Sequence, residues 1–152
     1  MLLGVANGTP IFATRLCGGR LNAPLDGGLK FPDGRPLFGP SKTVRGMVLS
    51  VACTTLAAPL LGFEWISGAG LASASMFGDL LSSFIKRRLG LRAHSQAPGL
   101  DQIPESLLPL LVLRQHLGLG YGDIAVIAAA FIVLELVLSR LLFRLHIRDR
   151  PY

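Results

Sequence analysis

Two polar segments of the chain combine carboxylates with cationic side chains. Segments 15–45 and 86–103, together with the helical stretch before the second, supply Asp26, Asp33, Lys42, Thr43, Arg45, Asp79, Lys86, Arg87, Arg88 and Asp101. Carboxylate oxygens are preferred ligands of Mg²⁺, the metal bridges phosphate oxygens, and Lys and Arg offset negative charge in a phosphoryl transition state. These residue types therefore predict polyphosphate chemistry at a site built from both segments.

Asp79 is notable because it lies near the end of an apolar stretch. At 100° per residue, one side of a helix would carry Asp79, Ser82, Ser83 and Lys86. The same stripe continues upstream with small residues, Gly68, Ala72 and Ser75, which would let another helix approach closely. A carboxylate at the centre of a membrane span costs roughly 2.5–3.5 kcal/mol, and less near its end, so an intramembrane Asp indicates a functional site.

Lys42 and Thr43 follow Gly39-Pro40-Ser41, which has some likeness to a phosphate-binding loop. The Walker pattern requires Gly directly before the Lys, between a strand and a helix, and neither condition is met here. However, Lys42, Thr43 and Arg45 lie at the start of a predicted helix. Its first amide groups and its dipole favour an anion, which predicts a phosphate contact at this position.

The composition predicts a membrane protein. Apolar residues make up 51% of the 152 residues and charged residues only 16%, which is unusual for a soluble domain. The net charge of +6 would suit nucleic-acid binding, but aromatic residues are few and the charges cluster between apolar stretches. That pattern is typical of cytoplasmic membrane loops, so no nucleic-acid partner is expected.

The apolar stretches predict an all-α polytopic membrane protein, a single integral membrane domain over 1–152 with about five transmembrane helices. The expected spans are 1–14, 44–63, 66–85, 104–119 and 123–145, joined by cytoplasmic site-forming loops 15–43 and 86–103. The first span is short or truncated, because a bilayer requires about 20 residues. Loop 15–43 is rich in Pro and Gly but also carries Leu and Phe, which favours an ordered loop over a solvated linker.

The distribution of Lys and Arg predicts the orientation of the spans. Segments 15–45 and 86–92 and the C-terminal tail are basic, whereas the turns near 64 and 120 carry almost no positive charge. Short basic loops remain in the cytoplasm. We therefore expect an integral protein of the cell membrane whose site faces the cytoplasm.

Glu135 lies near the middle of the last span and needs a partner. Arg114 is roughly 12 Å shallower at 1.5 Å per residue, so it should extend to the outer interface instead. Glu135 is then either a neutral residue packed against a helix or linked to the site. An alternative function is a small ion-coupled transporter using Asp79 and Glu135, although such proteins often show duplicated halves and no internal repeat is found.

Several motifs resemble those of the CDP-archaeol synthase family, CTP-dependent lipid-phosphate cytidylyltransferases of the CDP-diacylglycerol synthase superfamily. The resemblance covers almost the whole chain and rests on Ala6-Asn7-x-x-Pro10, Pro24-Leu25-Asp26-Gly27-Gly28, Phe31-Pro32-Asp33-Gly34-Arg35, Gly39 to Gly46, Gly78 to Gly90, and Leu100-Asp101-Gln102. Each motif is weak alone, but their order and spacing make the joint signal strong.

The resemblance implies an enzyme that uses Mg²⁺ and CTP to convert a membrane lipid phosphate to a CDP-lipid, releasing pyrophosphate. The lipid would be 2,3-di-O-geranylgeranylglycerol phosphate or a related phosphatidate. It implies that Asp79, Lys86 and Asp101 are catalytic and that Asp79 and Asp101 hold the metal. Substrate contacts are implied for Asn7, Asp26, Asp33, Lys42, Thr43, Arg45, Ser82, Ser83 and Arg87.

The sequence departs from the superfamily pattern after Asp101. The expected second carboxylate is absent, and Pro104-Glu105 follows instead, so Glu105 is a candidate for that place, one residue late. Neither the choice between ether and ester lipids nor the oligomeric state follows from the sequence.

Overall fold

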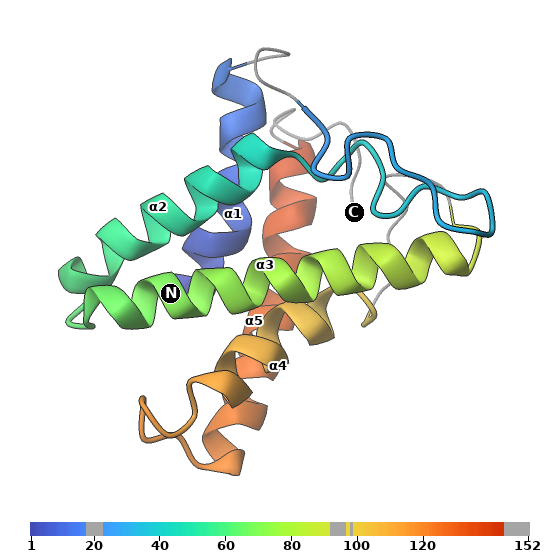
Figure 1. Cartoon of the computed structure of the whole chain (residues 1–152). Helices are drawn as coiled ribbons and strands as arrows, with labels where there is room; N and C mark the ends of the chain where they lie inside the picture. Colours follow the sequence, from blue (N-terminus) through green and yellow to red (C-terminus); the bar gives the residue numbers. More distant parts are fainter. Residues whose placement is uncertain (18–22, 92–96, 98, 145–152) are drawn as a thin grey trace.

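The computed structural model describes residues 1–17, 23–91, 97 and 99–144 and contains five α-helices within them (Figure 1). The helices are α1 (Leu2–Cys17), α2 (Val44–Leu60), α3 (Trp65–Arg88), α4 (Gln102–Val112) and α5 (Tyr121–Arg144). Over these residues, the strand-like pairings are two isolated bridges, Pro24 with Thr43 and Lys30 with Pro36. The prediction of an all-α chain is confirmed for the described residues.

The helix boundaries lie close to the predicted ones except in α4. That helix covers Gln102–Val112 instead of 104–119, and a series of turns follows it. Arg114 N donates to the carbonyl of Leu111, three residues earlier, rather than four as in a continuing α-helix. Gly118 has a φ of 64°, a left-handed conformation that ends such a segment before α5 begins.

One helix of the described residues is long and apolar enough to cross a membrane, within α5 at Tyr121–Leu141. Leu2–Ala13 and Val44–Leu60 are shorter apolar helices. The expected count of about five transmembrane helices therefore stays a prediction, as do the exact bounds of the loops.

α3 is the central helix and packs against α1, α2 and α4 (Figure 1). Two glycines permit backbone approach on either side. A Cβ atom added at Gly68 would lie 2.6 Å from Cβ of Ala58 on α2. A Cβ at Gly78 would lie 2.3 Å from the carbonyl oxygen of Pro104. The small-residue stripe predicted on this helix therefore does serve close helix packing.

α1 contains Pro10, which has no N–H to donate to the carbonyl of Ala6 four residues earlier. Ser50 of α2 is fully buried, and its hydroxyl donates to that carbonyl at 2.6 Å. The hydrogen bond that α1 lacks internally is thus supplied by its neighbour. This arrangement keeps a buried carbonyl satisfied where no water is available.

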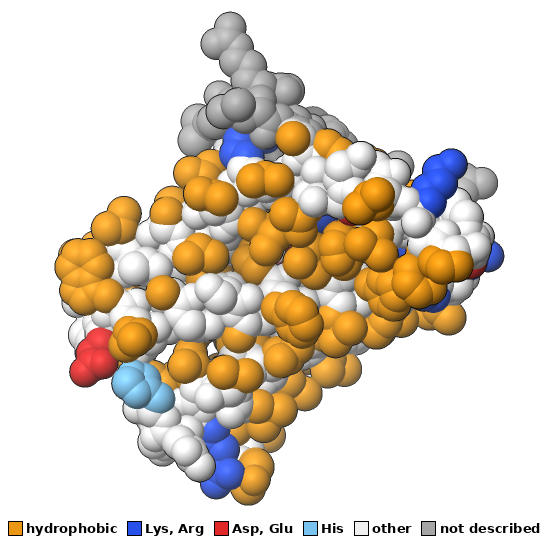
Figure 2. Space-filling view, in the orientation of Figure 1, with side chains coloured by type: hydrophobic (Ala, Val, Ile, Leu, Met, Phe, Trp, Pro, Cys, Tyr) orange, Lys and Arg blue, Asp and Glu red, His pale blue; other side chains and the backbone are white. Residues whose placement is uncertain are grey.

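Small polar side chains are buried between the helices beside an apolar core formed by residues such as Leu71, Leu110 and Phe131. The fully buried positions include five serines, Ser50, Ser75, Ser82, Ser83 and Ser106, while many large apolar side chains face outward. Figure 2 shows apolar side chains spread over the visible face of the helices. Small polar residues between helices and apolar residues outside are typical of helix packing in lipid.

Candidate active site

Loop 23–43 is ordered around the carboxylate of Asp26. One carboxylate oxygen accepts the N–H of Gly28 at 3.0 Å, and the other accepts those of Phe38 and Gly39, both at 2.9 Å. Burial opposes ionisation of Asp26, but the three backbone donors outweigh it and lower its pKa. Asp26 therefore joins the two ends of the loop as an ionised group.

The beginning and the end of the same loop lie side by side. Leu25 N donates to the carbonyl of Lys42 at 2.7 Å, and Val44 N donates to that of Ala23 at 3.2 Å. Thr43 is the N-cap of α2, with its hydroxyl accepting the N–H of Gly46 at 3.2 Å. These contacts fix the backbone on both sides of Lys42.

The tip of the loop binds the C-terminal end of α3 through hydrogen bonds and an ion pair. Arg35 Nη1 donates to the carbonyl oxygens of Arg87 and Arg88, at 3.2 and 2.6 Å, and so satisfies two of the last carbonyls of the helix. In return, Arg88 pairs with Asp33 at 2.8 Å and stacks over the ring of Phe31, 4.6 Å from its centroid. Loop and helix end are thus held together by reciprocal contacts.

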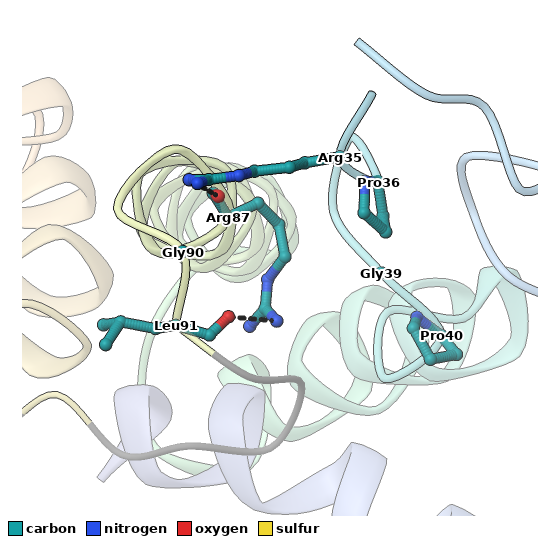
Figure 3. Close-up of a pocket in the computed structure, with 7 residues that line it drawn as sticks. All are labelled: Arg35, Pro36, Gly39, Pro40, Arg87, Gly90 and Leu91. Atoms are coloured by element: carbon teal, nitrogen blue, oxygen red, sulfur yellow. Dashed lines mark hydrogen bonds between the residues drawn. The ribbon is translucent and has the colours of Figure 1, made fainter. Parts of the chain in front are cut away.

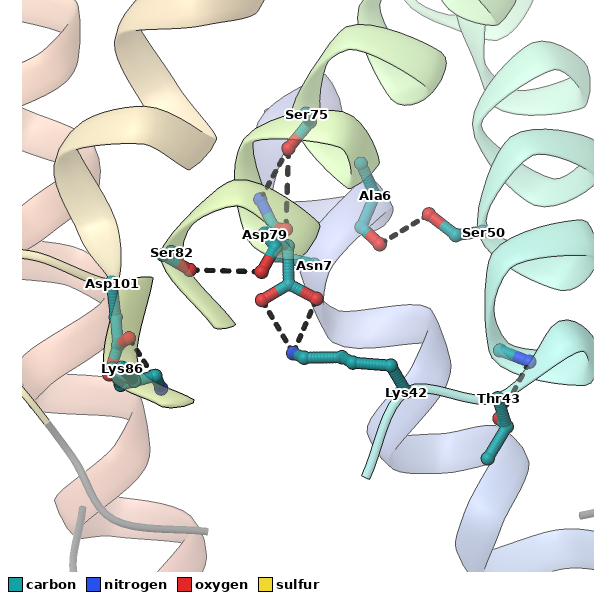
Figure 4. A network of polar contacts seen from close by, with 11 residues as sticks. Ala6, Asn7, Lys42, Thr43, Ser50, Ser75, Asp79, Ser82, Lys86 and Asp101 are labelled. Carbon is teal, nitrogen blue, oxygen red and sulfur yellow. Dashed lines mark hydrogen bonds and ion pairs between the residues drawn. The ribbon is translucent and has the colours of Figure 1, made fainter. Parts of the chain in front are cut away.

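Lys42 reaches from this loop to the side of α3, where its ammonium contacts both carboxylate oxygens of Asp79 (Figure 4). The Nζ–Oδ2 distance is 2.5 Å, and both side chains are about one-fifth exposed. Burial would lower the pKa of Lys42, but the Asp79 carboxylate raises it, with smaller contributions from Glu105 and Asp101. Lys42 is therefore held as a cation among three acidic residues.

Glu105, in the first turn of α4, faces Asp79 across the contact between α3 and α4. The two carboxyl groups are hydrogen-bonded to each other. Glu135 of α5 lies close enough to Glu105 to interact with it electrostatically. The acidic side chains of α3 and α4 therefore lie beside Lys42, and that of α5 interacts with the α4 member, which favours the link between Glu135 and the site.

A second ion pair lies two helical turns further along α3. Lys86 Nζ is 2.6 Å from the Asp101 carboxylate, which also accepts the N–H of Ala97 at 3.0 Å. Figure 4 shows this pair beside the pair formed by Lys42 and Asp79. Asp79 and Lys86 therefore lie on one face of α3, as their spacing predicts, but each pairs with a residue from another segment: Asp79 with Lys42 and Lys86 with Asp101.

The remaining predicted residues lie within α1, α2 and α3. Ser82 donates to the carbonyl of Asp79 at 2.9 Å, Ser83 is buried, and Arg45 is buried in the first turn of α2. Asn7 donates to the carbonyl of Leu3 at 3.0 Å and to Ser75 at 3.1 Å. The substrate roles implied for these residues stay predictions.

A cavity of about 340 Å³ lies between the loop and the end of α3 (Figure 3). Its lining residues are Arg35, Pro36, Gly39, Pro40, Arg87, Gly90 and Leu91. Arg87 is buried and donates to the carbonyl of Leu91 at 2.8 Å. The cavity therefore combines guanidinium groups with proline walls, which suits an anionic organic molecule.

The carboxyl groups of Asp79 and Glu105 are of a chemical type that fits a divalent cation such as Mg²⁺. The described residues contain no group of three or more His, Cys, Asp or Glu able to hold a metal ion. Asp79 and Glu105 nevertheless bring oxygen donors together from adjacent helices, and Mg²⁺ usually takes one or two carboxylates and completes its shell with phosphates and water. The metal role predicted for Asp79 and Asp101 stays a prediction, and in this structure the Asp101 carboxylate pairs with Lys86.

Two contributors were not foreseen from the sequence. Arg35 was noted only as part of the Phe31-to-Arg35 motif, and no role was predicted for it. In the structure its guanidinium caps the last carbonyls of α3. Ser75 was assigned to close packing, whereas its hydroxyl donates to the carbonyl of Glu105. Pro109 could have indicated this role. It lies four residues after Glu105 and has no N–H, so the Glu105 carbonyl needs a donor from outside its own helix.

Comparisons with known proteins point to one family. The family model described as CarS-like, CDP-archaeol synthase, matches residues 61–152. The CDP-archaeol synthase of Sulfurisphaera tokodaii is 34% identical over 97% of this chain and 89% of its own length, and that of Pyrobaculum calidifontis is 36% identical over 97% and 91%. A solved structure of "an intramembrane enzyme for archaeal membrane lipids biosynthesis" is 31% identical, with a TM-score of 0.70 over 91% of this chain and 90% of that one.

Proposed function

The chain belongs to the CDP-archaeol synthase family and forms a CDP-lipid from CTP in membrane lipid biosynthesis, and we propose how its residues carry out that reaction. The lipid is proposed to be 2,3-di-O-geranylgeranylglycerol phosphate, the ether-linked form suggested by the names of its relatives. The site is the group formed by Lys42, Asp79, Lys86, Asp101 and Glu105.

The reaction is an in-line displacement at the α-phosphorus of CTP. An oxygen of the lipid phosphate forms a bond to that phosphorus, and the bond to the bridging oxygen of the β-phosphate breaks, so that pyrophosphate leaves. The protein needs to hold two anionic reactants together and to offset their charge. Lys86 and Arg87 lie in the last turn of α3, and Lys42 reaches the same helix from the loop before α2. Cations brought together from two segments can offset the charge of both reactants.

We propose Mg²⁺ as the cofactor, with Asp79 and Glu105 as its protein ligands and Asp101 as a further carboxylate of the site. When bound, Mg²⁺ neutralises phosphate charge and makes the α-phosphorus more electrophilic. Lys42 would then exchange its contact with Asp79 for a phosphate oxygen. Its raised pKa keeps it cationic for that purpose.

One observation supports this proposal most strongly. The ammonium of Lys42 and two carboxyl groups, from α3 and α4, meet at one point although they lie far apart in sequence. A purely structural ion pair would not need the second carboxyl group. Cations and carboxylates in contact with one another are what a metal–triphosphate complex requires.

We also propose that the protein lies in the cytoplasmic membrane with this site facing the cytoplasm. CTP is a cytoplasmic nucleotide, and the basic loop 23–43 and the basic end of α3 share one side of the molecule. The lipid phosphate lies at the same interface as those residues. Both reactants would therefore reach the site from one side of the bilayer.

The test is a substrate panel with purified protein in lipid nanodiscs. Radiolabelled CTP and Mg²⁺ are supplied with either the geranylgeranyl ether lipid phosphate or an ester-linked phosphatidate, and labelled CDP-lipid is measured after extraction. We expect the ether lipid to be converted. Conversion of the ester lipid alone would refute the proposed substrate, and no product from either would refute the proposed reaction.

A further inference from the structure

We propose that Asn7 and Ser75 are positioning residues for this reaction: together they hold the backbone of α4 at Glu105, and thereby the Glu105 carboxyl group against Asp79. Neither side chain is proposed to contact a substrate. The inference rests on the proposed function, because it concerns the same carboxyl pair.

The starting point is an unsatisfied carbonyl in α4. In an α-helix the carbonyl of Glu105 would accept the N–H of residue 109, but that residue is Pro109, which has none. The hydroxyl of Ser75 donates to this carbonyl at 2.9 Å instead. Ser75 is fully buried, so water cannot take its place as the donor.

Asn7 of α1 completes the arrangement from the other side. Its amide Nδ2 donates to the Ser75 hydroxyl at 3.1 Å, and the Ser75 oxygen also lies 3.3 Å from Asn7 Oδ1 (Figure 4). Nδ2 donates in addition to the carbonyl of Leu3 at 3.0 Å. The Ser75 hydroxyl has one proton and two acceptors in reach, and the Glu105 carbonyl at 2.9 Å is closer than Asn7 Oδ1 at 3.3 Å. With the Ser75 oxygen accepting from Asn7 Nδ2, we assign that proton to the Glu105 carbonyl. A chain of two hydrogen bonds therefore runs from α1 through α3 to α4.

The position of this chain ties it to the site. Ser75 lies one helical turn before Asp79 on the same face of α3, and Glu105 supplies both the carbonyl that Ser75 binds and the carboxyl group that Asp79 binds. Between the two contacts Gly78 touches the peptide of Pro104 with no space for a Cβ. The α4 backbone is thus held at two neighbouring points, which fixes the direction of the Glu105 side chain.

The chain also contains a matched control. Ser50 satisfies the carbonyl of Ala6, which Pro10 leaves without a donor, in the same way as Ser75 satisfies that of Glu105. Both serines are fully buried and both donate to a carbonyl of a neighbouring helix. Only Ser75 acts on a residue whose side chain lies in the site.

The experiment compares Ser75→Ala with Ser50→Ala in the lipid-phosphate assay and in thermal unfolding. We expect both variants to lower Tm by a similar amount, roughly 2–8 °C, because each leaves one buried carbonyl unsatisfied. Only Ser75→Ala should lower kcat, by about 10- to 100-fold, with a much smaller change in KM for CTP, because a displaced carboxyl group affects the reaction more than binding.

A second-site change separates positioning from general packing. Pro109→Ala restores an N–H that the carbonyl of Glu105 can accept, so Ser75→Ala combined with Pro109→Ala should regain most of the lost kcat. Asn7→Ala, compared with Thr9→Ala on the same helix, should lower kcat in the same direction, and its effect should not add fully to that of Ser75→Ala.

The proposal is overturned if Ser75→Ala keeps its kcat, if Ser50→Ala loses kcat equally, or if Pro109→Ala fails to restore activity to the Ser75 variant. Should Ser75→Ala not fold, Asn7→Ala against Thr9→Ala decides the question by the same criterion. Failure of the proposed function is a different result, because the unmodified protein would then form no CDP-lipid.

Discussion

The ammonium of Lys42 contacts both carboxylate oxygens of Asp79, and the two residues are 37 positions apart in the chain. The first lies in the loop before α2, and the second lies in the third quarter of α3. Their contact joins the loop that is proposed to bind phosphate to the helix that is proposed to hold the metal. This contact lies at the centre of the proposed site.

Asp79→Asn should reduce kcat by about 10²–10³-fold or more. The amide keeps the size of the side chain but removes the charge that Lys42 and a bound cation need. The variant is to be assayed for CDP-lipid with its Tm measured in parallel. Asp123→Asn is the control, because that exposed carboxylate only accepts the N–H of Gly120 near the start of α5. Full activity of the Asp79 variant would remove this residue from the metal site.

Removing divalent cations should abolish CDP-lipid formation, and adding Mg²⁺ should restore it. Glu105→Gln should raise the Mg²⁺ concentration needed for half-maximal stabilisation of the CTP-bound protein by about tenfold or more, a change of about 1.4 kcal/mol. The measurement is Tm against Mg²⁺ concentration. Glu64→Gln, at the other end of α3, should leave the curve unchanged. An unchanged curve for Glu105→Gln would exclude Glu105 as a ligand.

Gly78→Ala should destabilise the protein by about 1–3 kcal/mol or more, because its new methyl group would lie 2.3 Å from the carbonyl oxygen of Pro104. Gly8→Ala in α1 is the matched change, since nothing lies within 4 Å of a Cβ there. In a helix, that change should be neutral or stabilising by about 0.5–1 kcal/mol. Thermal unfolding of the two variants measures the difference, and equal stability would contradict the close contact of α3 and α4.

Asp26→Asn should destabilise loop 23–43 by about 1–3 kcal/mol at neutral pH, since an amide cannot accept all three backbone N–H groups. The folded pKa of Asp26 is lowered from 3.8, so its contribution to the free energy of unfolding is present above that value. The contribution is lost as the pH falls through the folded pKa. The Tm difference between wild type and variant should therefore be constant from pH 7 to about 4 and shrink below it.

Asp33→Asn is the comparison for that experiment. Asp33 lies at the exposed tip of the same loop and pairs with Arg88, and such a pair contributes about 0–1 kcal/mol. Its effect should be smaller than that of Asp26→Asn. An equal or larger effect would show that the loop is held at its tip rather than through Asp26.

Labelling of single cysteines tests the orientation. Cys17 and Cys53 are first replaced, so that each variant carries a single cysteine. The Ser41→Cys variant should react with a membrane-impermeant maleimide in inverted vesicles, and the Gln115→Cys variant should react with it in intact cells. Both positions are outside the helices, and Ser41 and Gln115 are exposed. The reverse pattern would place the site on the outer face of the membrane.

The sequence predicted the helices well because their determinants are local. Apolar stretches, prolines and glycines place α2, α3 and α5 to within a few residues. α4 was predicted too long because the leucines at 113, 117 and 119 were taken to extend its apolar span, whereas the hydrogen bonds of residues 113–119 form successive turns. Isolated leucines among polar residues do not distinguish these two conformations.

The partners within the site could not be derived in the same way. Helical spacing placed Asp79 and Lys86 on one face, but it does not say that Lys42 reaches the first and Asp101 the second. Those pairings depend on how loop 23–43 folds back, which the buried Asp26 determines through contacts 12 and 13 residues away. Asp26 itself was assigned to substrate binding, and the structure shows its carboxylate occupied by the backbone.

The close contact of Gly78 with the Pro104 peptide has a consequence for biosynthesis. Asp79 meets the carboxyl group of Glu105 only after α4 has docked on α3. A nascent chain that has formed its first three helices therefore carries Lys42 and Asp79 but not yet the complete proposed site. Catalytic competence should arise late during translation, so the appearance of CDP-lipid would report that α4 has joined the bundle.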